Sequence, residues 1–226
     1  MNDSATYVSR KIREARSVIV ITGPGVVDFE LERPTTEAFK ENPSSFYYNL
    51  IDYLWKGKPR NKCKNFLPMI EKMGKLRRVA TQNIDETEGD AITDKGKVIE
   101  LCGNIREYFC LECKSECTNA KESISSRKVP RCRSCEGAVA PRIIFHGMPT
   151  APRSCEALMF NMCMADLILV IGVSLERSPF LPSILKSAYG QIIVFPSDSI
   201  SDFPEKTLFL NHPISEFLSE VMQLTS

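Results

Sequence analysis

The sequence predicts an α/β protein, a doubly wound, Rossmann-like parallel sheet interrupted by an inserted four-cysteine zinc ribbon. Two observations lead to this prediction. Short runs rich in β-branched residues alternate with helical stretches along most of the chain, which is typical of a parallel sheet covered by helices on both faces. Two C-x-x-C pairs then occur close together in a polar segment that breaks this alternation.

The expected strands are continuous apolar runs without polar alternation, as in strands buried on both faces. The clearest is DLILVIG at 166–172. The last helix is expected after a cap at Asn211 or His212, with Pro213 in its first turn. In chain order, the expected elements are helix 4–16, strand 17–22, helices 43–55 and 62–73, strands 76–81, 97–101 and 166–172, helix 179–188, strand 191–195 and the final helix.

The polar, cysteine-rich segment 104–141 is interpreted as an insertion. Residues 1–103 and 142–226 then form the nucleotide-binding domain, and 104–141 forms the zinc-binding module. Ligands bind at the carboxyl ends of the strands in such sheets, so functional residues are expected in the segments that follow strands. These are GPG at 23–25, TQNID at 81–85, CGN at 102–104 and GVS at 172–174.

Composition limits the possible functions. The chain has 226 residues, 43% of them hydrophobic, with a formal net charge of +1, which argues against non-specific nucleic-acid binding. The amino terminus is polar, and the longest apolar runs are strand-sized, well short of the roughly 20 residues of a membrane-spanning helix. An intracellular protein, nuclear or cytoplasmic, is therefore expected. Its nine cysteines favour reduced thiols and a metal over a disulfide framework.

The two C-x-x-C pairs predict a zinc site. Cys110 and Cys113 form one pair, Cys132 and Cys135 the other, and the spacing between the pairs is that of a zinc ribbon. Four thiolates complete a tetrahedral shell with no open position, so a structural zinc is expected. The alternative is a set of unrelated buried cysteines. Cys117 is the nearest competing ligand, and the other thiols, Cys63, Cys155 and Cys163, are interpreted as small core residues.

Two strand-end segments indicate nucleotide binding. Gly23 and Gly25 follow the first strand in T-G-P-G, where glycines let a backbone approach a phosphate. Gln82, Asn83 and Asp85 follow the next strand in T-Q-N-I-D and offer two amides and a carboxylate. Asp85 could instead cap the helix that follows.

Taken in order, the motifs resemble the sirtuins, the NAD-dependent protein deacylases. TGPG is similar to that family's TGAG, and TQNID is identical to its nicotinamide-pocket motif. The segment IELCGNIREYFC resembles its strand, catalytic His-Gly and first zinc cysteine. APRIIFHGMP resembles its R-P-x-I-V-x-F-G-E segment, and ADLILVIGVSL its ADLLLVIGTSL. The resemblance covers nearly the whole chain, with the zinc ribbon in the right place.

The resemblance implies that NAD binds between the large domain and the zinc module, and that an acyl-lysine protein or another protein is the partner. Bound NAD would lose nicotinamide to attack by the acyl oxygen, while a histidine acts as general base. Carried over to this chain, the implied cofactor contacts are Gly23, Gly25 and Phe29 at the phosphate loop, Gln82 at the ribose, Asn83, Ile84 and Asp85 at the nicotinamide, and Gly172 and Ser174 at the adenosine side.

The departures from the family pattern lie at the catalytic positions. Cys102 occupies the place of the catalytic histidine, and a thiol is a poor proton acceptor near neutral pH. The loop after Gly25 is shortened, and Glu30 replaces an arginine. His146 stands where the family has a phenylalanine, either filling that position or acting as a relocated base. Further departures are Met148 for a glutamate, Val173 for a threonine, and Phe195-Pro196 where an asparagine is usual.

Two hypotheses follow. In the first, the protein is a sirtuin-fold pseudoenzyme that binds NAD or ADP-ribose, as a sensor or as a binding module for a protein partner, with weak or no deacylase activity. In the second, it is an active NAD-dependent deacetylase or ADP-ribosyl transferase in which Cys102 or His146 moves the proton, with Asn83 and Asp85 at the reaction centre. Loss of the base together with part of the phosphate clamp favours the first.

Overall fold

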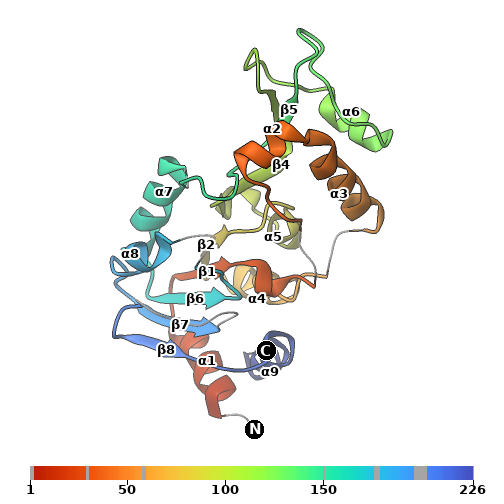
Figure 1. The fold of residues 1–226 in the computed structure, drawn as a ribbon. Helices are drawn as coiled ribbons and strands as arrows, with labels where there is room; N and C mark the ends of the chain where they lie inside the picture. Colours follow the sequence, from red (N-terminus) through yellow and green to blue (C-terminus); the bar gives the residue numbers. More distant parts are fainter. Residues whose placement is uncertain are drawn as a thin grey trace.

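The computed structural model describes residues 3–28, 31–57, 60–149, 151–175, 179–195 and 203–225, and its largest feature is a six-stranded sheet (Figure 1). Neighbouring strands all run parallel, in the order β3-β2-β1-β6-β7-β8. The strands are β1 (Val18–Thr22), β2 (Leu76–Thr81), β3 (Val98–Glu100), β6 (Leu167–Ile171), β7 (Gln191–Phe195) and β8 (Thr207–Phe209). The predicted parallel sheet is confirmed, and β8, a three-residue edge strand, is added to it.

Helices cover both faces of the sheet because successive side chains of a strand point to opposite sides. In β1, Val18 and Val20 pack into one apolar cluster, whereas Ile19 and Ile21 pack into the other. The cluster of Val18 includes α1 (Asp3–Glu14), α4 (Phe66–Lys72) and α9 (Ile214–Thr225), and that of Ile19 includes α7 (Pro152–Met162) and α8 (Leu181–Leu185). No helix in the described ranges has both the length and the apolarity to cross a membrane.

Helix α4 begins at Phe66, later than the predicted residue 62. The side-chain oxygen of Asn61 accepts a hydrogen bond from the Cys63 N–H at 2.7 Å, and the N–H of Lys62 donates to the Val26 carbonyl at 2.7 Å. Such side-chain bonds give the backbone an alternative to the helix. Residues 61–65 are therefore a turn held against the loop after β1.

The cysteine-rich segment forms a separate unit at the top of Figure 1. Its two strands, β4 (Gly103–Cys110) and β5 (Val139–Ile143), pair antiparallel and flank α6 (Ala120–Ser125) in the chain. The earlier helices α2 (Thr36–Glu41) and α3 (Pro43–Trp55) lie beside this unit (Figure 1). Helix α3 packs against α6. The boundaries at 104 and 141 stay a prediction.

The candidate site lies at the point in the sheet where the order of the strands changes direction. From β1 the sheet continues through β2 on one side and, after β3 and the cysteine-rich unit, through β6 on the other, so the loops after β1 and β6 are neighbours. Ligands bind at such switch points in open parallel sheets. Here the two loops touch: Gly25 donates its N–H to the carbonyl of Gly172 at 2.8 Å. Gly172 has φ of 60°, a conformation that favours glycine.

We expect Gly172→Ala to destabilise the fold far more than Gly74→Ala. Both glycines have positive φ, which costs an L-residue about 1–2 kcal/mol. A Cβ at Gly74 would meet nothing within 4 Å, whereas one at Gly172 would lie 2.7 Å from the carbonyl carbon of Gly25. Urea unfolding should give a loss of roughly 3 kcal/mol or more for Gly172→Ala. Equal losses for the two variants would contradict the close packing of these loops.

Candidate functional site

Gln82 joins the ends of β2 and β6 across the sheet. Its Oε1 accepts from the Ser174 N–H at 3.0 Å, and its Nε2 donates to the Ser174 carbonyl at 2.8 Å. Both residues are buried. The amide therefore fixes the spacing of two loops that the sequence assigns to one ligand.

The glycine loop after β1 is folded inward. The N–H of Gly23 donates to the Ile171 carbonyl at 3.1 Å, that of Gly25 to Gly172, and that of Val26 back to the Gly23 carbonyl at 3.2 Å. A Cβ on Gly23 would lie 2.4 Å from Gln82 Oε1 and 2.5 Å from the Gly172 carbonyl oxygen. The absence of a side chain at these glycines thus lets the loops after β1 and β6 pack closely, and the N–H groups of the glycines bond within the protein.

Glu88, in the short helix α5 (Thr87–Ala91), is completely buried at the centre of the site. Its Oε1 accepts from the Thr22 hydroxyl at 2.9 Å, from Asn83 Nδ2 at 2.8 Å and from Asn61 Nδ2 at 3.2 Å. Burial raises the pKa of the Glu88 carboxyl, and the carboxylate of Asp85 raises it further. One side chain therefore joins the ends of β1 and β2 to the turn before α4.

The contact with Glu88 also orients the amide of Asn83. Its Nδ2 donates to Glu88 and, at 3.3 Å, to the Gly23 carbonyl. The other amide atom, Oδ1, is then directed away from Glu88 as an acceptor. Asn83 also lines a small pocket.

That small pocket, here called the Asp85 pocket, contains most of the T-Q-N-I-D motif. Its volume is about 10 Å³, room for about one water molecule, so a ring-sized ligand requires a lining side chain such as Leu31 to move. Arg33 closes another side, with its Nη1 donating to the Ile144 carbonyl at 3.0 Å. The lining residues are Val27, Leu31, Arg33, Gln82, Asn83, Ile84 and Asp85.

The carboxylate of Asp85 is bonded on both oxygens. The Tyr53 hydroxyl, from α3, donates to Oδ2, while Oδ1 accepts from the N–H of Thr87 at 3.2 Å and from its hydroxyl at 3.0 Å. The N-cap residue of α5 is Glu86, and Thr87 is the first residue of the helix. Asp85, one residue before the cap, therefore bonds to the first turn of α5 and also lines the pocket.

The two candidate bases lie in different surroundings. Cys102 is 0% exposed and belongs to an apolar cluster that includes Leu101 and Phe145. His146 is exposed, and its backbone N–H donates to the Pro34 carbonyl at 2.9 Å. The buried aromatic at this point is Phe145, whose ring centroid lies 5.2 Å from that of Phe39. His146 therefore does not fill an interior aromatic position.

Of the remaining predicted positions, Ile84 and Val173 are buried and Met148 is half exposed. Phe29, Glu30 and Pro196 lie outside the described residues.

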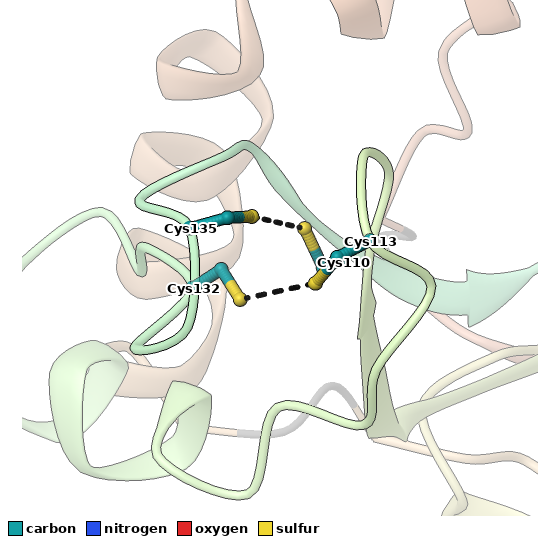
Figure 2. Close-up of side chains that lie close together, drawn as sticks. All are labelled: Cys110, Cys113, Cys132 and Cys135. Carbon is teal, nitrogen blue, oxygen red and sulfur yellow. Dashed lines mark hydrogen bonds between the residues drawn. The ribbon is translucent and has the colours of Figure 1, made fainter.

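The four predicted zinc ligands converge from two sides (Figure 2). Their Sγ atoms all lie within 4.8 Å of one another, with Cys110 to Cys135 at 3.5 Å and Cys113 to Cys132 at 3.7 Å. Four Zn–S bonds of about 2.3 Å define a tetrahedron with edges of about 3.8 Å. The cluster therefore fits a structural zinc ion. Cys117 lies outside it, with its thiol 3.7 Å from the Ser115 carbonyl.

The two knuckles repeat one backbone pattern. Lys114 donates its N–H to the Cys110 carbonyl at 3.2 Å, and Glu136 donates to the Cys132 carbonyl at 2.9 Å. Both donors have positive φ. The N–H of Ser134 points at Cys132 Sγ, and this bond is the main reason that the pKa of Cys132 falls to about 5. This N–H favours the thiolate form of Cys132, which binds metal, whereas the nearby thiols of Cys110 and Cys113 raise the pKa of Cys135 to about 12.

The other three cysteines differ in exposure. Cys63 is buried, as interpreted from the sequence, and Cys155 is partly buried. Cys163 is exposed beyond the end of α7, so its interpretation as a core residue was wrong.

Sequence reasoning missed Glu88, Asn61 and Tyr53. Glu88 lies in T-E-G-D-A, which has the composition of an exposed turn, and Asn61 and Tyr53 reach the site only through tertiary packing. The one available signal was proximity, since Glu88 follows the T-Q-N-I-D motif within a single helical turn.

Known proteins resemble this chain along most of its length. The model of the Sir2 family matches residues 26–179. An NAD-dependent protein deacylase of Thermococcus kodakarensis is 29% identical over 203 residues, covering 85% of this chain and 77% of that protein. An NAD-dependent protein deacetylase of Thermotoga maritima is 28% identical over 240 residues, covering 94% of each.

Solved structures agree with this result. The structure of Sir2Af2 bound to a myristoylated histone peptide superposes with a TM-score of 0.81 at 25% identity, covering 100% of this chain and 97% of the other. A Sir2 complex with a p53 peptide and NAD⁺ gives 0.78 at 26% identity, covering 99% and 98%.

We expect Cys110→Ala to abolish zinc binding and to lower stability sharply, because a metal-binding unit of this size depends on its ion for folding. Cys117→Ala, the matched control, should keep about one zinc per chain. Elemental analysis of freshly purified protein provides the measurement. Unmodified protein with less than half an equivalent of zinc would contradict the site.

Glu88→Gln should change how stability depends on pH. Because the folded-state pKa of Glu88 is raised above its ordinary 4.5, its stabilising effect is complete below that value and is lost as pH rises through the folded pKa. The wild type should therefore lose stability relative to Glu88→Gln above pH 4.5, by up to ~1.4 kcal/mol per pH unit. Urea unfolding between pH 4.5 and 8 measures this, and parallel curves would contradict it.

Proposed function

Because this chain belongs to the Sir2 family, we propose that it binds NAD or ADP-ribose at the strand-end loops and has little or no deacylase activity. The binding half rests on similarity to NAD-dependent deacylases over most of the chain and to a Sir2 structure with NAD⁺. The low activity rests on one observation, the burial of Cys102 at the position that resembles the family's catalytic histidine.

The polar groups of the Asp85 pocket suit a nicotinamide ring with its carboxamide. Asn83 Oδ1 is directed as an acceptor by Glu88, while Asp85 supplies a carboxylate beside it. A carboxamide N–H₂ can donate to either. Binding requires the pocket to widen beyond its present volume of about 10 Å³, and the side chain of Leu31 borders it without a polar anchor. The residues therefore fit the group once Leu31 moves.

Gln82 would meet the ribose and Ser174 the adenosine side, and the paired hydrogen bonds between these two residues set the distance between the two loops. In the described part of the phosphate loop, the N–H groups of Gly23 and Gly25 bond to carbonyl groups of the protein and are not available to a diphosphate. Bound NAD supplies an activated ribose carbon with nicotinamide as its leaving group. These features support retained cofactor binding with weakened phosphate contacts.

Proton transfer is the catalytic step for which we expect this chain to lack a suitable side chain. A general base must come within hydrogen-bonding distance of the hydroxyl that it deprotonates. Cys102 is buried in an apolar cluster, and His146 is exposed. We therefore expect neither side chain to act as a base on a bound ribose. The expected partner is an acyl-lysine peptide, which the similar Sir2Af2 structure holds as a myristoylated histone peptide.

We expect calorimetry to detect NAD or ADP-ribose binding, while nicotinamide release with an acylated peptide is at least ~100-fold slower than for the Thermotoga maritima relative, the lower range for a missing general base. If only the base is missing, Cys102→His should raise the residual rate, because imidazole accepts a proton near neutral pH. Melting temperatures check that the buried site tolerates the larger ring.

His146→Phe distinguishes the alternative. If His146 is a relocated base, this substitution abolishes release, and if the proposal holds, it leaves the residual rate unchanged. Rapid NAD-dependent deacylation by the unmodified protein would show that the site is active and that the proposal is wrong.

A further inference from the structure

Helix α3 carries two buried tyrosines whose hydroxyls bond to different parts of the protein. Tyr47 donates to the Val139 carbonyl of β5 at 2.8 Å, and Tyr53 donates to Asp85 Oδ2. Six residues of helix separate them by roughly 240° around the helix axis, so they leave it on different sides. One side chain anchors α3 to the cysteine-rich unit and the other to the Asp85 pocket.

The Tyr53 contact controls the orientation of the Asp85 carboxylate. Among the residues that the structure describes, the other donors to this carboxylate both belong to Thr87, and both bond to Oδ1. A carboxylate held at one oxygen can still rotate about that contact, whereas a donor on Oδ2 from another element fixes its plane. Tyr53 comes from α3, which has a core in common with the cysteine-rich unit.

Tyr53 is suited to remain a donor. It is buried, and burial, followed by the nearby Asp85 carboxylate, raises the pKa of Tyr53 far above its ordinary range. The hydroxyl therefore keeps its proton, and the hydrogen bond to the carboxylate persists across the working range of pH.

We propose that Tyr53 is a positioning residue, which holds Asp85 so that the pocket accepts the nicotinamide end of a dinucleotide. This inference rests on the proposed NAD binding and adds a residue to it. Because Tyr53 donates to Asp85, we expect it to affect ligands that carry nicotinamide and to leave those without it, such as ADP-ribose, unaffected. Through α3, the geometry of the pocket is also tied to the unit that holds the zinc cluster.

The test compares Tyr53→Phe with Tyr47→Phe, which removes the same hydroxyl from the same helix but away from the pocket. Calorimetric affinities for NAD and for ADP-ribose are measured on each zinc-loaded full chain. We expect Tyr53→Phe to weaken NAD binding by roughly tenfold, the range for a hydrogen bond to a charged group, with ADP-ribose affinity unchanged. For Tyr47→Phe, the ratio of the two affinities should stay that of the wild type.

A purely structural role for Tyr53 would lower both affinities together, and this result would overturn the inference. The double variant Tyr53→Phe/Asp85→Ala provides a second measurement. If Tyr53 acts through Asp85, the double variant binds NAD as Asp85→Ala alone does, because the effects of coupled residues do not add. Additive losses would also overturn it. If the unmodified protein binds neither ligand, the proposed function is refuted. If it binds both and Tyr53→Phe leaves the ratio of NAD to ADP-ribose affinity unchanged, only the inference about Tyr53 is refuted.

Discussion

The carboxyl group of Glu88 is the contact on which the geometry of this site depends. It accepts hydrogen bonds from Thr22 at the end of β1, Asn83 after β2 and Asn61 before α4, three segments that no other described side chain joins. Burying a carboxyl group costs free energy unless its oxygens accept hydrogen bonds. The three donor side chains are therefore held within hydrogen-bonding distance of Glu88. The orientation of the Asn83 amide, and hence the polarity of the Asp85 pocket, follows from this one buried acid.

The glycines at the switch point illustrate how one motif can serve two purposes. The sequence suggested a loop open to a phosphate, because glycine lets a ligand approach the backbone. In the structure the same lack of a side chain lets the loops after β1 and β6 approach each other, with Gly23 against Gln82 and Gly172 against Gly25. Backbone N–H groups that bond to carbonyls across this contact are not presented to an anion, although the motif is intact. The presence of the glycine motif in a sequence therefore does not establish that its backbone N–H groups are available to bind a phosphate.

The sheet was predictable because buried parallel strands are continuous apolar runs, and VIVIT and LILVI match β1 and β6. The zinc cluster was predictable because its ligands lie in two local knuckles, whose turns bring each pair together. Tyr53, Asn61 and Glu88 were not predictable, since each meets the site through contacts made by the whole fold. The start of α4 was missed for a related reason, as Asn61 and Lys62 bond to residues outside the helix.

The apolar surroundings of Cys102 explain why the fold tolerates a thiol at the position that resembles the family's catalytic histidine. Cys102 is 0% exposed and belongs to the same apolar cluster as Leu101, Ile143 and Phe145, and cysteine behaves as a small apolar residue in such places. An imidazole there would need a partner for each ring nitrogen or would lose the free energy of its hydration. The apolar cluster and the residue type are thus consistent with each other, because cysteine is a small side chain without strong polar groups. Reactivation at this position therefore requires both a proton acceptor and an opening of the cluster that gives it access to the ribose.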